Sequence, residues 1–261
     1  MFLQLLFLSG TTIFIYMVVW YLLGLIKKDN SIIDIAWGLG FIVVAYANIW
    51  FTGNTGTKQL FLLSLVTIWG LRLAFYLFIR NRGVGEDYRY AQWRRDWKYF
   101  NLRAFFQIFM LQGTIMWAVA LPIMVCLAST ASAMAWYHWL GLGIWLVGFY
   151  FEAVGDWQKY RFKTNPANKG KTIMTGLWAY TRHPNYFGES LMWWGVFLLS
   201  LGSSYWYISL ISPVLLTFFL IKVSGVAMLE KKYRGDMEYA DYQRRTNSFI
   251  PWWPKKPKKL F

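Results

Sequence analysis

Residues 176–190 read GLWAYTRHPNYFGES and lead directly into the apolar run 191–201. A polar, basic loop that meets an apolar run predicts the start of a membrane helix. Pro184 suits the first turn of that helix, because a proline there loses no hydrogen bond and already has the required φ. Asn185 and Glu189 are four residues apart and therefore share one face of the helix. A carboxylate one turn inside a membrane helix is costly and by default marks a functional site.

Two interpretations of this stretch compete. In the functional one, Arg182 and His183 stand beside the expected helix N-terminus, whose unpaired N–H groups and positive dipole end favour a phosphate. In the structural one, the stretch is only a polar helix cap, and Arg182 extends to lipid headgroups. Several chemically distinct side chains meet here, so we favour a functional site.

The composition excludes a soluble domain. The chain of 261 residues is 57% hydrophobic and 21% aromatic, and its mean hydropathy is +0.33. Apolar runs of about twenty residues recur along it, which is typical of a polytopic helical membrane protein. The single cysteine, Cys126, excludes an intrachain disulfide. The two histidines, His138 and His183, are far apart in sequence, so we expect no metal site. The first run lacks the pattern of a cleavable signal and is interpreted as a retained helix.

We therefore predict an all-α fold with seven transmembrane helices in one domain that comprises the whole chain. The spans are expected at 1–26, 31–51, 60–79, 104–127, from 136 to beyond 150, at 186–201 and from 208 to about 228. The fifth helix should continue into water to about residue 163. Residues 80–103 are charged and aromatic and should form a partly helical segment at the lipid headgroups. The tail from residue 230 should be helical to about residue 246.

The basic residues predict the orientation. All but Lys58, Arg72 and Lys222 of the 27 Lys and Arg residues follow the first, third and fifth spans or lie in the tail. Seven spans put these segments on one side, so the N-terminus is expected outside and the C-terminus in the cytoplasm. The net charge of +15 is then a one-sided field that attracts anionic membrane lipids, and the terminal KKPKK is explained in this way. We expect no nucleic-acid partner, because the aromatic residues are spread through the spans rather than arranged as a stacking platform.

Polar side chains recur at helical spacing near the basic ends of the expected spans. They are Asp34; Trp69, Arg72, Tyr76 and Arg80; Glu152, Asp156, Lys159 and Lys163; Asn185 and Glu189; and Lys231, Lys232, Tyr233, Tyr239 and Tyr242. A structural lock between Arg72 and a carboxylate competes for any single pair. The whole set suits a ligand with phosphates, hydroxyls and an amide, such as a dinucleotide. The sequence contains no GxGxxG, Walker, HExxH or GxSxG motif, so the helices themselves would have to bind it.

The motif at 176–190, together with EKKYRGDMEYADYQRRTNSFIPW at 230–252, resembles the C-terminal region of the steroid 5α-reductase family (3-oxo-5α-steroid 4-dehydrogenases) and in particular its bacterial DUF1295-type branch. The resemblance is strong over 151–253 and extends to WGLRLAFYLFIRNRGVGEDYRY at 69–90. It implies a seven-helix, NADPH-dependent reductase of lipid metabolism in a bacterial inner membrane, with the cofactor site facing the cytoplasm. The substrate would be an enone in a lipophilic, steroid-like molecule that enters from the bilayer. No protein partner is implied.

The resemblance also implies roles for individual residues. The cofactor contacts would be Arg72, Tyr76, Arg80, Glu152, Asp156, Lys163, Tyr180, Arg182, Asn185, Lys231, Lys232 and Tyr233. The family's animal enzymes polarise the substrate carbonyl with a glutamate on the second helix and a tyrosine on the third. This chain has only Asp34 on the second helix and has Trp69 at the tyrosine's place. We expect Asp34 or a tyrosine to donate the proton, and we expect Glu189 to orient Asn185 or Arg182.

Two other functions stay open at this point. Isoprenylcysteine carboxyl methyltransferases also carry an RHPxYxG-like motif before a membrane helix and use S-adenosylmethionine. A lipid-binding or transport protein would use the polar residues as locks or as a conduction path. Such a path predicts polar groups at both ends of the spans, whereas here nearly all lie at the basic end.

Overall fold

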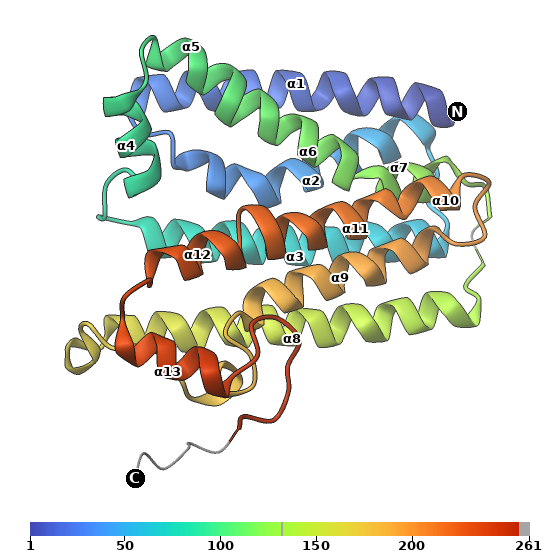
Figure 1. Cartoon of the computed structure of the whole chain (residues 1–261). Coiled ribbons are helices and arrows are strands. Elements are labelled where there is room, and N and C mark those ends of the chain that lie inside the picture. The colour runs from blue at the N-terminus through green and yellow to red at the C-terminus, as the bar shows by residue number, and fades with distance from the viewer. Residues whose placement is uncertain (132, 256–261) are drawn as a thin grey trace. The chain divides into compact units, whose positions relative to one another are not determined.

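The computed structural model describes residues 1–131 and 133–255, except for the side chain of Lys232. Every regular element in these ranges is a helix (Figure 1). The chain divides into two compact units. The first comprises Met1–His138 and Leu199–Ser212, and the second comprises Trp139–Leu198 and Pro213–Phe261.

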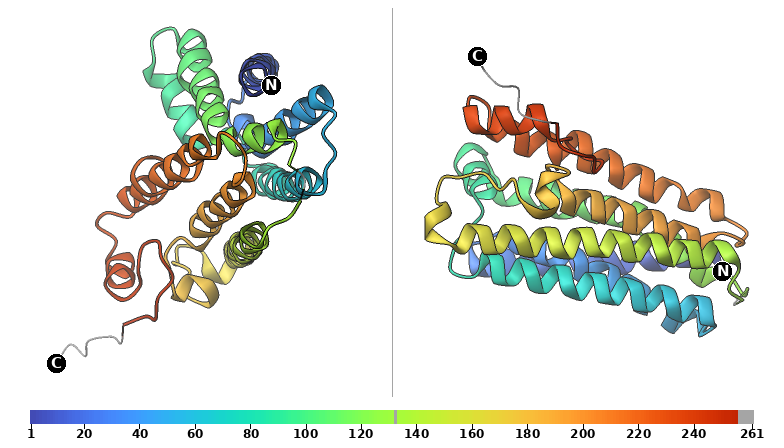
Figure 2. Two further views of the ribbon diagram at one scale, coloured as in Figure 1. Left: turned by 90° about the vertical axis from the view of Figure 1, so that its right-hand side faces the viewer. Right: turned by 90° about the horizontal axis from the view of Figure 1, so that it is seen from below.

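Three long helices form the N-terminal part of the first unit. They are α1 (Phe2–Lys27), α2 (Ile32–Thr52) and α3 (Thr57–Asn81), which run side by side (Figure 2). The contact between α2 and α3 has no room for a side chain, since a Cβ on Gly70 would lie 2.5 Å from the Gly38 carbonyl oxygen. The two helices therefore touch through their backbones, as small residues allow in membrane proteins.

The expected fourth span is helical but not uniform. It comprises α5 (Phe100–Ala104), the π-helical turn η1 (Phe105–Met110), α6 (Leu111–Val119) and α7 (Leu121–Ala128). The break at Ala120 precedes Pro122, which lies in the first turn of α7 and cannot donate a backbone hydrogen bond. Before this span lies α4 (Tyr88–Asp96), so the prediction of a partly helical segment at 80–103 is confirmed.

Most of α8 (Trp136–Thr164) and α9 (Pro184–Ser200) belong to the second unit. The start of α9 at Pro184 and the continuation of α8 past residue 163 confirm two predictions from the sequence. Between them lie two short 3₁₀ turns, η2 (Pro166–Asn168) and η3 (Gly176–Ala179).

The expected seventh span lies within a helical stretch that could cross a membrane, Trp206–Lys231, but this stretch is not one continuous helix. It consists of α10 (Trp206–Ser209), α11 (Ile211–Phe218) and the π-helical turn η4 (Phe219–Val223), and it breaks before α12 (Val226–Lys232). At the break a Cβ on Gly225 would lie 2.1 Å from the Leu220 carbonyl oxygen, so the chain turns there on a glycine. The tail helix α13 (Met237–Arg245) follows and ends about where the sequence predicted.

Glycines spaced by seven residues join α8 to α9. Gly141 on α8 touches the backbone of α9 at Gly195, and two turns further along Gly148 touches Gly188. A Cβ on Gly188 would lie 2.4 Å from the Gly148 carbonyl oxygen and 2.5 Å from the Glu152 backbone nitrogen. This contact holds the acidic stretch of α8 directly against the motif on α9.

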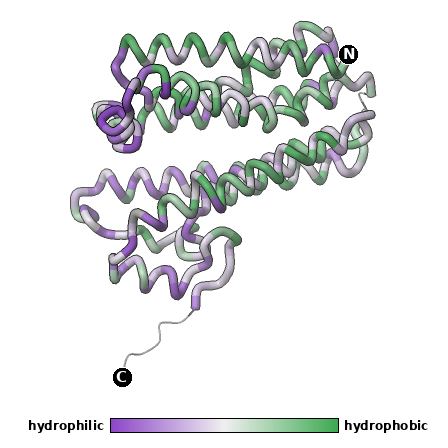
Figure 3. Tube along the Cα trace, turned by 45° about the horizontal axis from the view of Figure 1, so that its top comes forward, coloured by the Kyte–Doolittle hydropathy of each residue, from purple (hydrophilic) through white to green (hydrophobic). Residues whose placement is uncertain are grey.

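Several helices have the length and the apolar surface that a membrane span requires. Among the described residues, five helical stretches are long and apolar enough to span one: Phe2–Lys27, Ile32–Thr52, Thr57–Asn81, Phe100–Val119 and Trp206–Lys231. On α1 the large apolar side chains Leu3, Phe7 and Ile26 are each 78–79% exposed, as expected of a helix that faces lipid. In each unit the hydrophilic residues gather toward one end of the helices (Figure 3). The all-α membrane architecture is thus supported.

Candidate functional site

The motif turn is paired with a distant segment of the second unit. The Arg182 backbone N–H donates to the Asn247 carbonyl oxygen at 2.9 Å, and the Trp252 N–H donates to the Tyr180 carbonyl oxygen at 2.9 Å. The turn therefore receives its backbone partners from residues after α13. We call the segment 247–252 the tail clamp.

Side chains reinforce the tail clamp. The Thr181 hydroxyl donates to the Phe249 carbonyl oxygen at 2.8 Å. The Tyr242 hydroxyl on α13 donates to the Trp178 carbonyl oxygen. Because a buried backbone group without a partner is costly, these bonds make the tail a structural requirement of the motif.

The Arg182 guanidinium is committed to protein partners. Its Nε and Nη2 donate to Glu230 Oε1 at 2.8 and 2.6 Å. Its Nη1 donates to the carbonyl oxygens of Gln243, at 3.1 Å, and Thr246. Arg182 is only 8% exposed. It thereby ties the start of α9 to α12 and α13.

His183 is a buried polar side chain whose hydrogen-bonding capacity is unused among the described residues. It stacks on Tyr186, with ring centroids 5.4 Å apart. Its Nε2 lies 3.5 Å from Glu230 Oε1, longer than an ordinary hydrogen bond, and neither ring nitrogen has a hydrogen-bond partner among the described residues. Burial lowers the pKa of His183, against the opposing effect of Glu230, so the ring is neutral near pH 7.

An acid–amide pair lies one turn into α9. Asn185 Nδ2 donates to Asp156 Oδ1 at 3.2 Å. Asn185 Oδ1 is buried and accepts no hydrogen bond from the described residues. Asp156 and Glu152, one turn apart on α8, are 4% and 2% exposed, and Glu189 on α9 is half-buried. The sequence-predicted acids and amide of the fifth and sixth helices are therefore brought together.

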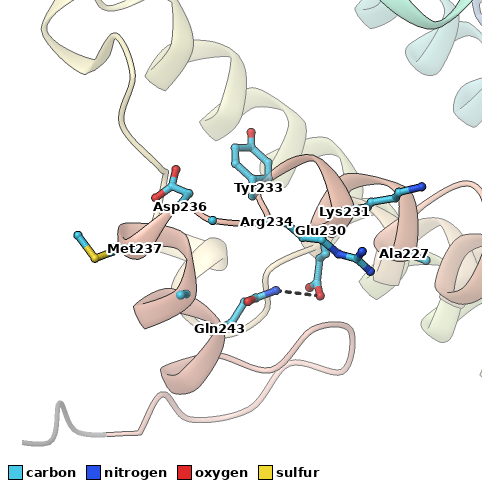
Figure 4. A pocket seen from close by; sticks show the side chains of 10 residues that line it. Ala227, Glu230, Lys231, Tyr233, Arg234, Asp236, Met237 and Gln243 are labelled. Carbon is cyan, nitrogen blue, oxygen red and sulfur yellow. Dashed lines mark hydrogen bonds between the residues drawn. The ribbon is translucent and has the colours of Figure 1, made fainter.

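A cavity of about 650 Å³ opens between α12 and α13 (Figure 4). Glu230, Lys231, Tyr233, Arg234 and Gln243 are among its lining residues. Gln243 Nε2 donates to Glu230 Oε2 at 3.2 Å, so the carboxylate that holds Arg182 also forms part of the cavity wall. The predicted residues Lys231 and Tyr233 thus share one cavity, while the side chain of Lys232 lies outside what the structure describes.

The first unit holds a separate set of predicted residues. Asp34 Oδ2 accepts from Arg89 Nη2 at 3.1 Å, and Asp34 Oδ1 accepts from the Tyr90 hydroxyl at 2.9 Å. These bonds join α4 to the start of α2. Trp69 is 2% exposed and packs edge-on against Phe41, with ring centroids 5.5 Å apart.

The remaining predicted residues are more open to the surroundings. On α3 the exposed Arg80 lies over the Tyr76 ring, 5.8 Å from its centroid, and Arg72, one turn before Tyr76, is half-buried. In the second unit Lys163 is exposed at the end of α8, and Tyr180 is 38% exposed.

Sequence reasoning missed two parts of this site. It did not single out Glu230, because its pairing with Arg182 joins residues 48 positions apart and has no local pattern. It also missed the contact between α8 and α9, although Gly141, Gly148 and Gly155 recur every seventh residue and could have indicated it.

Comparisons with known proteins include a distant sequence similarity to a sterol reductase. An uncharacterized protein of Schizosaccharomyces pombe is 28% identical over 171 residues, which is 56% of this chain and 49% of that protein. The Delta(14)-sterol reductase of Ascobolus immersus is 29% identical over 149 residues, 49% of this chain and 31% of the reductase. A protein of Ustilaginoidea virens named Probable O-methyltransferase ustE is 40% identical over 65 residues, 25% of this chain and 23% of that protein.

The chain spans about half or less of the length of these relatives. No solved structure matches it. The model of one family, described as "Protein of unknown function (DUF1295)", matches residues 20–246, which cover most of both units and the whole motif. The chain therefore belongs to the DUF1295 family.

Proposed function

We propose that the chain is a membrane-embedded NADPH-dependent reductase that acts on the C=C bond of an enone in a lipophilic, steroid-like substrate. The observation that carries the proposal is the partly buried Asp156–Asn185 pair, whose Asn185 Oδ1 accepts no hydrogen bond from the described residues. The match to a sterol reductase over 149 residues supports the same chemistry. We further propose seven spans in a bacterial inner membrane, with the N-terminus outside and the cofactor side in the cytoplasm.

The residues present fit a nicotinamide dinucleotide. The carboxamide of that cofactor carries an N–H₂ group, which suits the open acceptor at Asn185 Oδ1. Ribose hydroxyls suit the carboxylates of Glu152 and Asp156. Lys231 and Arg234 are exposed cations at a cavity of about 650 Å³, a size typical of small-molecule sites. Phosphates would form charge-assisted hydrogen bonds with these cations.

Arg182 has a different role in this proposal from the one its motif implies. Its guanidinium already binds Glu230 and two carbonyl oxygens, so we assign it to positioning Asn185 rather than to holding a phosphate. Arg72, Arg80 and Lys163 stay proposed phosphate contacts, and Tyr76, Tyr180, Lys231, Lys232 and Tyr233 stay proposed cofactor contacts.

When bound, NADPH supplies the hydride that reduces the enone at its β-carbon. The protein excludes water, orients the substrate that arrives from the bilayer and provides the proton. The Tyr90 hydroxyl donates a hydrogen bond to Asp34 Oδ1. We propose this pair as the proton donor, with Trp69 shaping the substrate site and Glu189 orienting Asn185.

Binding measurements test the proposal. Purified protein in detergent is titrated with NADPH, NADH and S-adenosylmethionine while its thermal unfolding is followed. NADPH should stabilise it most, because one charge-assisted hydrogen bond to the 2′-phosphate adds about 1.5–3 kcal/mol, about tenfold or more in affinity. Equal stabilisation by NADPH and NADH would count against the assignment.

Asn185→Ala tests the site itself, with Asn101→Ala as the control because Asn101 is exposed in the first unit. The Asn185 variant should fold in reasonable yield yet bind NADPH at least tenfold more weakly, whereas the control binds like the parent. An Asn185 variant that melts early but keeps the parent's affinity would reduce the motif to a helix cap.

A methyltransferase is the second candidate, because 65 residues of the chain are 40% identical to the O-methyltransferase relative. Stabilisation by S-adenosylmethionine alone would favour it. A protein that only binds or transports lipid should be stabilised by none of the three compounds.

A further inference from the structure

The tail clamp ends in an exposed aromatic surface. Ile250, Trp252 and Trp253 are 64%, 67% and 73% exposed. Three large apolar side chains so close in sequence are seldom left to water, and a surface of this kind marks a contact with a partner or a membrane. We call Ile250, Trp252, Trp253 and Lys255 the tail surface.

The backbone of this segment is pinned at two points. The Trp252 N–H donates to the Tyr180 carbonyl oxygen, and the Lys255 N–H donates to the Arg245 carbonyl oxygen, both at 2.9 Å. The Trp253 ring also packs edge-on against Tyr180, with ring centroids 5.5 Å apart. Figure 1 shows the segment leaving α13 and turning back toward α8 and the loop before α9. The exposed rings are therefore held outward by an ordered backbone.

The chemistry of the tail surface fits the headgroup region of a bilayer. Tryptophan prefers this region, because its ring is apolar and its N–H still needs a polar partner. Lys255 is exposed and follows Trp253 by two residues in the sequence. The sequence continues with Lys256, Lys258 and Lys259, which lie outside the described residues. Basic residues near an anionic membrane surface are attracted to its lipid headgroups.

We propose that the tail surface is an interfacial anchor that binds anionic phospholipids and thereby holds the motif turn in place. Ile250, Trp252 and Trp253 enter the headgroup region, and Lys255 faces the lipid phosphates. Since the same backbone bonds to Tyr180 and, five residues earlier, to Arg182, anchoring the tail stabilises the turn that begins α9. The membrane composition would then act on the candidate site.

Site-specific fluorescence tests the anchor and uses no cofactor. With Cys126→Ser removing the single cysteine, Trp252→Cys carries an environment-sensitive probe in nanodiscs with nitroxide-labelled lipids. Lys169→Cys, exposed in the loop between α8 and α9, is the matched control. Lipid quenching should be several-fold stronger at 252 than at 169. It should increase when phosphatidylglycerol is added to phosphatidylcholine, and high salt should remove this increase.

Equal quenching at the two positions, or the same quenching in neutral and anionic lipid, would overturn the anchor. A second variant tests the link to the motif. Trp252→Ser with Trp253→Ser keeps every backbone N–H, so it should fold. Exchange of the Arg182 amide hydrogen should become several-fold faster in anionic nanodiscs. Unchanged exchange would show that the tail does not hold the turn. Neither readout depends on NADPH, so a failed cofactor assignment would leave both results interpretable.

Discussion

Arg182 and Glu230 form a partly buried ion pair, with side chains 9% and 21% exposed. Desolvation offsets much of the attraction within such a pair, but removal of one partner leaves a charge uncompensated. The pair therefore specifies how α12 meets the motif more than it adds net stability. This local role explains why the arginine of the motif forms its hydrogen bonds with other protein groups.

Glu230→Gln should destabilise the protein by about 3 kcal/mol, because it leaves the Arg182 charge poorly compensated. Asp241→Asn is the control, since Asp241 pairs with Arg244 and Arg245 at the surface and such pairs are worth about 0–1 kcal/mol. Denaturant unfolding in detergent, followed by tryptophan fluorescence, measures both. Equal losses in the two variants would show that the Arg182–Glu230 pair behaves as a surface pair.

His183 gives the protein a pH dependence. Burial lowers its pKa below the ordinary value of 6.5, and the nearby positive charges of Lys159 and Arg182 act in the same direction. Below pH 6.5 the unfolded chain therefore binds more protons than the native one, and stability decreases as the pH falls. Above that pH the contribution of His183 is constant.

The melting temperature of the parent should drop between pH 7.5 and pH 5.5 by more than that of His183→Gln. Glutamine is polar and similar in size to histidine, but it cannot take up a proton in this pH range. Identical slopes for the two proteins would show that His183 is not the group that titrates.

At the level of helices, α8 and α9 can approach closely because the residues at their contact are glycines, which have no side chain. Gly188 lies within the motif, and its Cα faces backbone atoms of Gly148 and Glu152. A methyl group there has no flexible neighbour to displace, so the helices themselves would have to separate. Separation would move Asp156 away from Asn185, which links packing to the site.

Gly188→Ala should cost about 1–3 kcal/mol through overpacking. It should also weaken cofactor binding. Gly143→Ala on α8 is the matched control, because a Cβ there meets nothing within 4 Å. Alanine is the better helix former, so the control should gain up to about 1 kcal/mol. Thermal unfolding compares them, and a Gly188 variant as stable as the parent would contradict the close contact.

Local patterns predicted the helices well and their interruptions poorly. The start of α9 follows from Pro184, and the length of α8 follows from the spacing of its polar residues. The break before α12 does not follow from hydropathy, because it arises where the Gly225 backbone packs against the Leu220 carbonyl oxygen. The switch to π-helical hydrogen bonds in η1 and η4 likewise leaves no simple sequence pattern.

The same limit applies to the candidate site. Asn185 and Asp156 could be proposed together, because each lies at helical spacing beside another polar residue. The partners of Arg182 could not, because Glu230 and the tail clamp come from distant parts of the chain. A motif shows which residues matter but not which of them face the ligand.

At the scale of the whole molecule, charge placement predicts the orientation of the spans. With Cys126→Ser as background, Thr55→Cys lies in the loop before α3, and Asn101→Cys lies at the start of α5. Because basic segments stay in the cytoplasm, an impermeant thiol reagent should label Thr55→Cys in intact cells. It should label Asn101→Cys only after lysis. Labelling of Asn101→Cys from outside would reverse the proposed topology.

The tail clamp also has a consequence for biosynthesis. Arg182 and the Thr246 carbonyl oxygen it binds are 64 residues apart, and the motif is translated first. At about 5–20 residues per second, the motif turn exists for roughly 3–13 s before its partners are made. For the first 48 residues of this stretch, until Glu230 is made, Arg182 has neither Glu230 nor the tail to bind. A ribosome stalled before α13 should therefore hold a chain whose α8 and α9 are inserted while its motif turn is still cleaved by added protease.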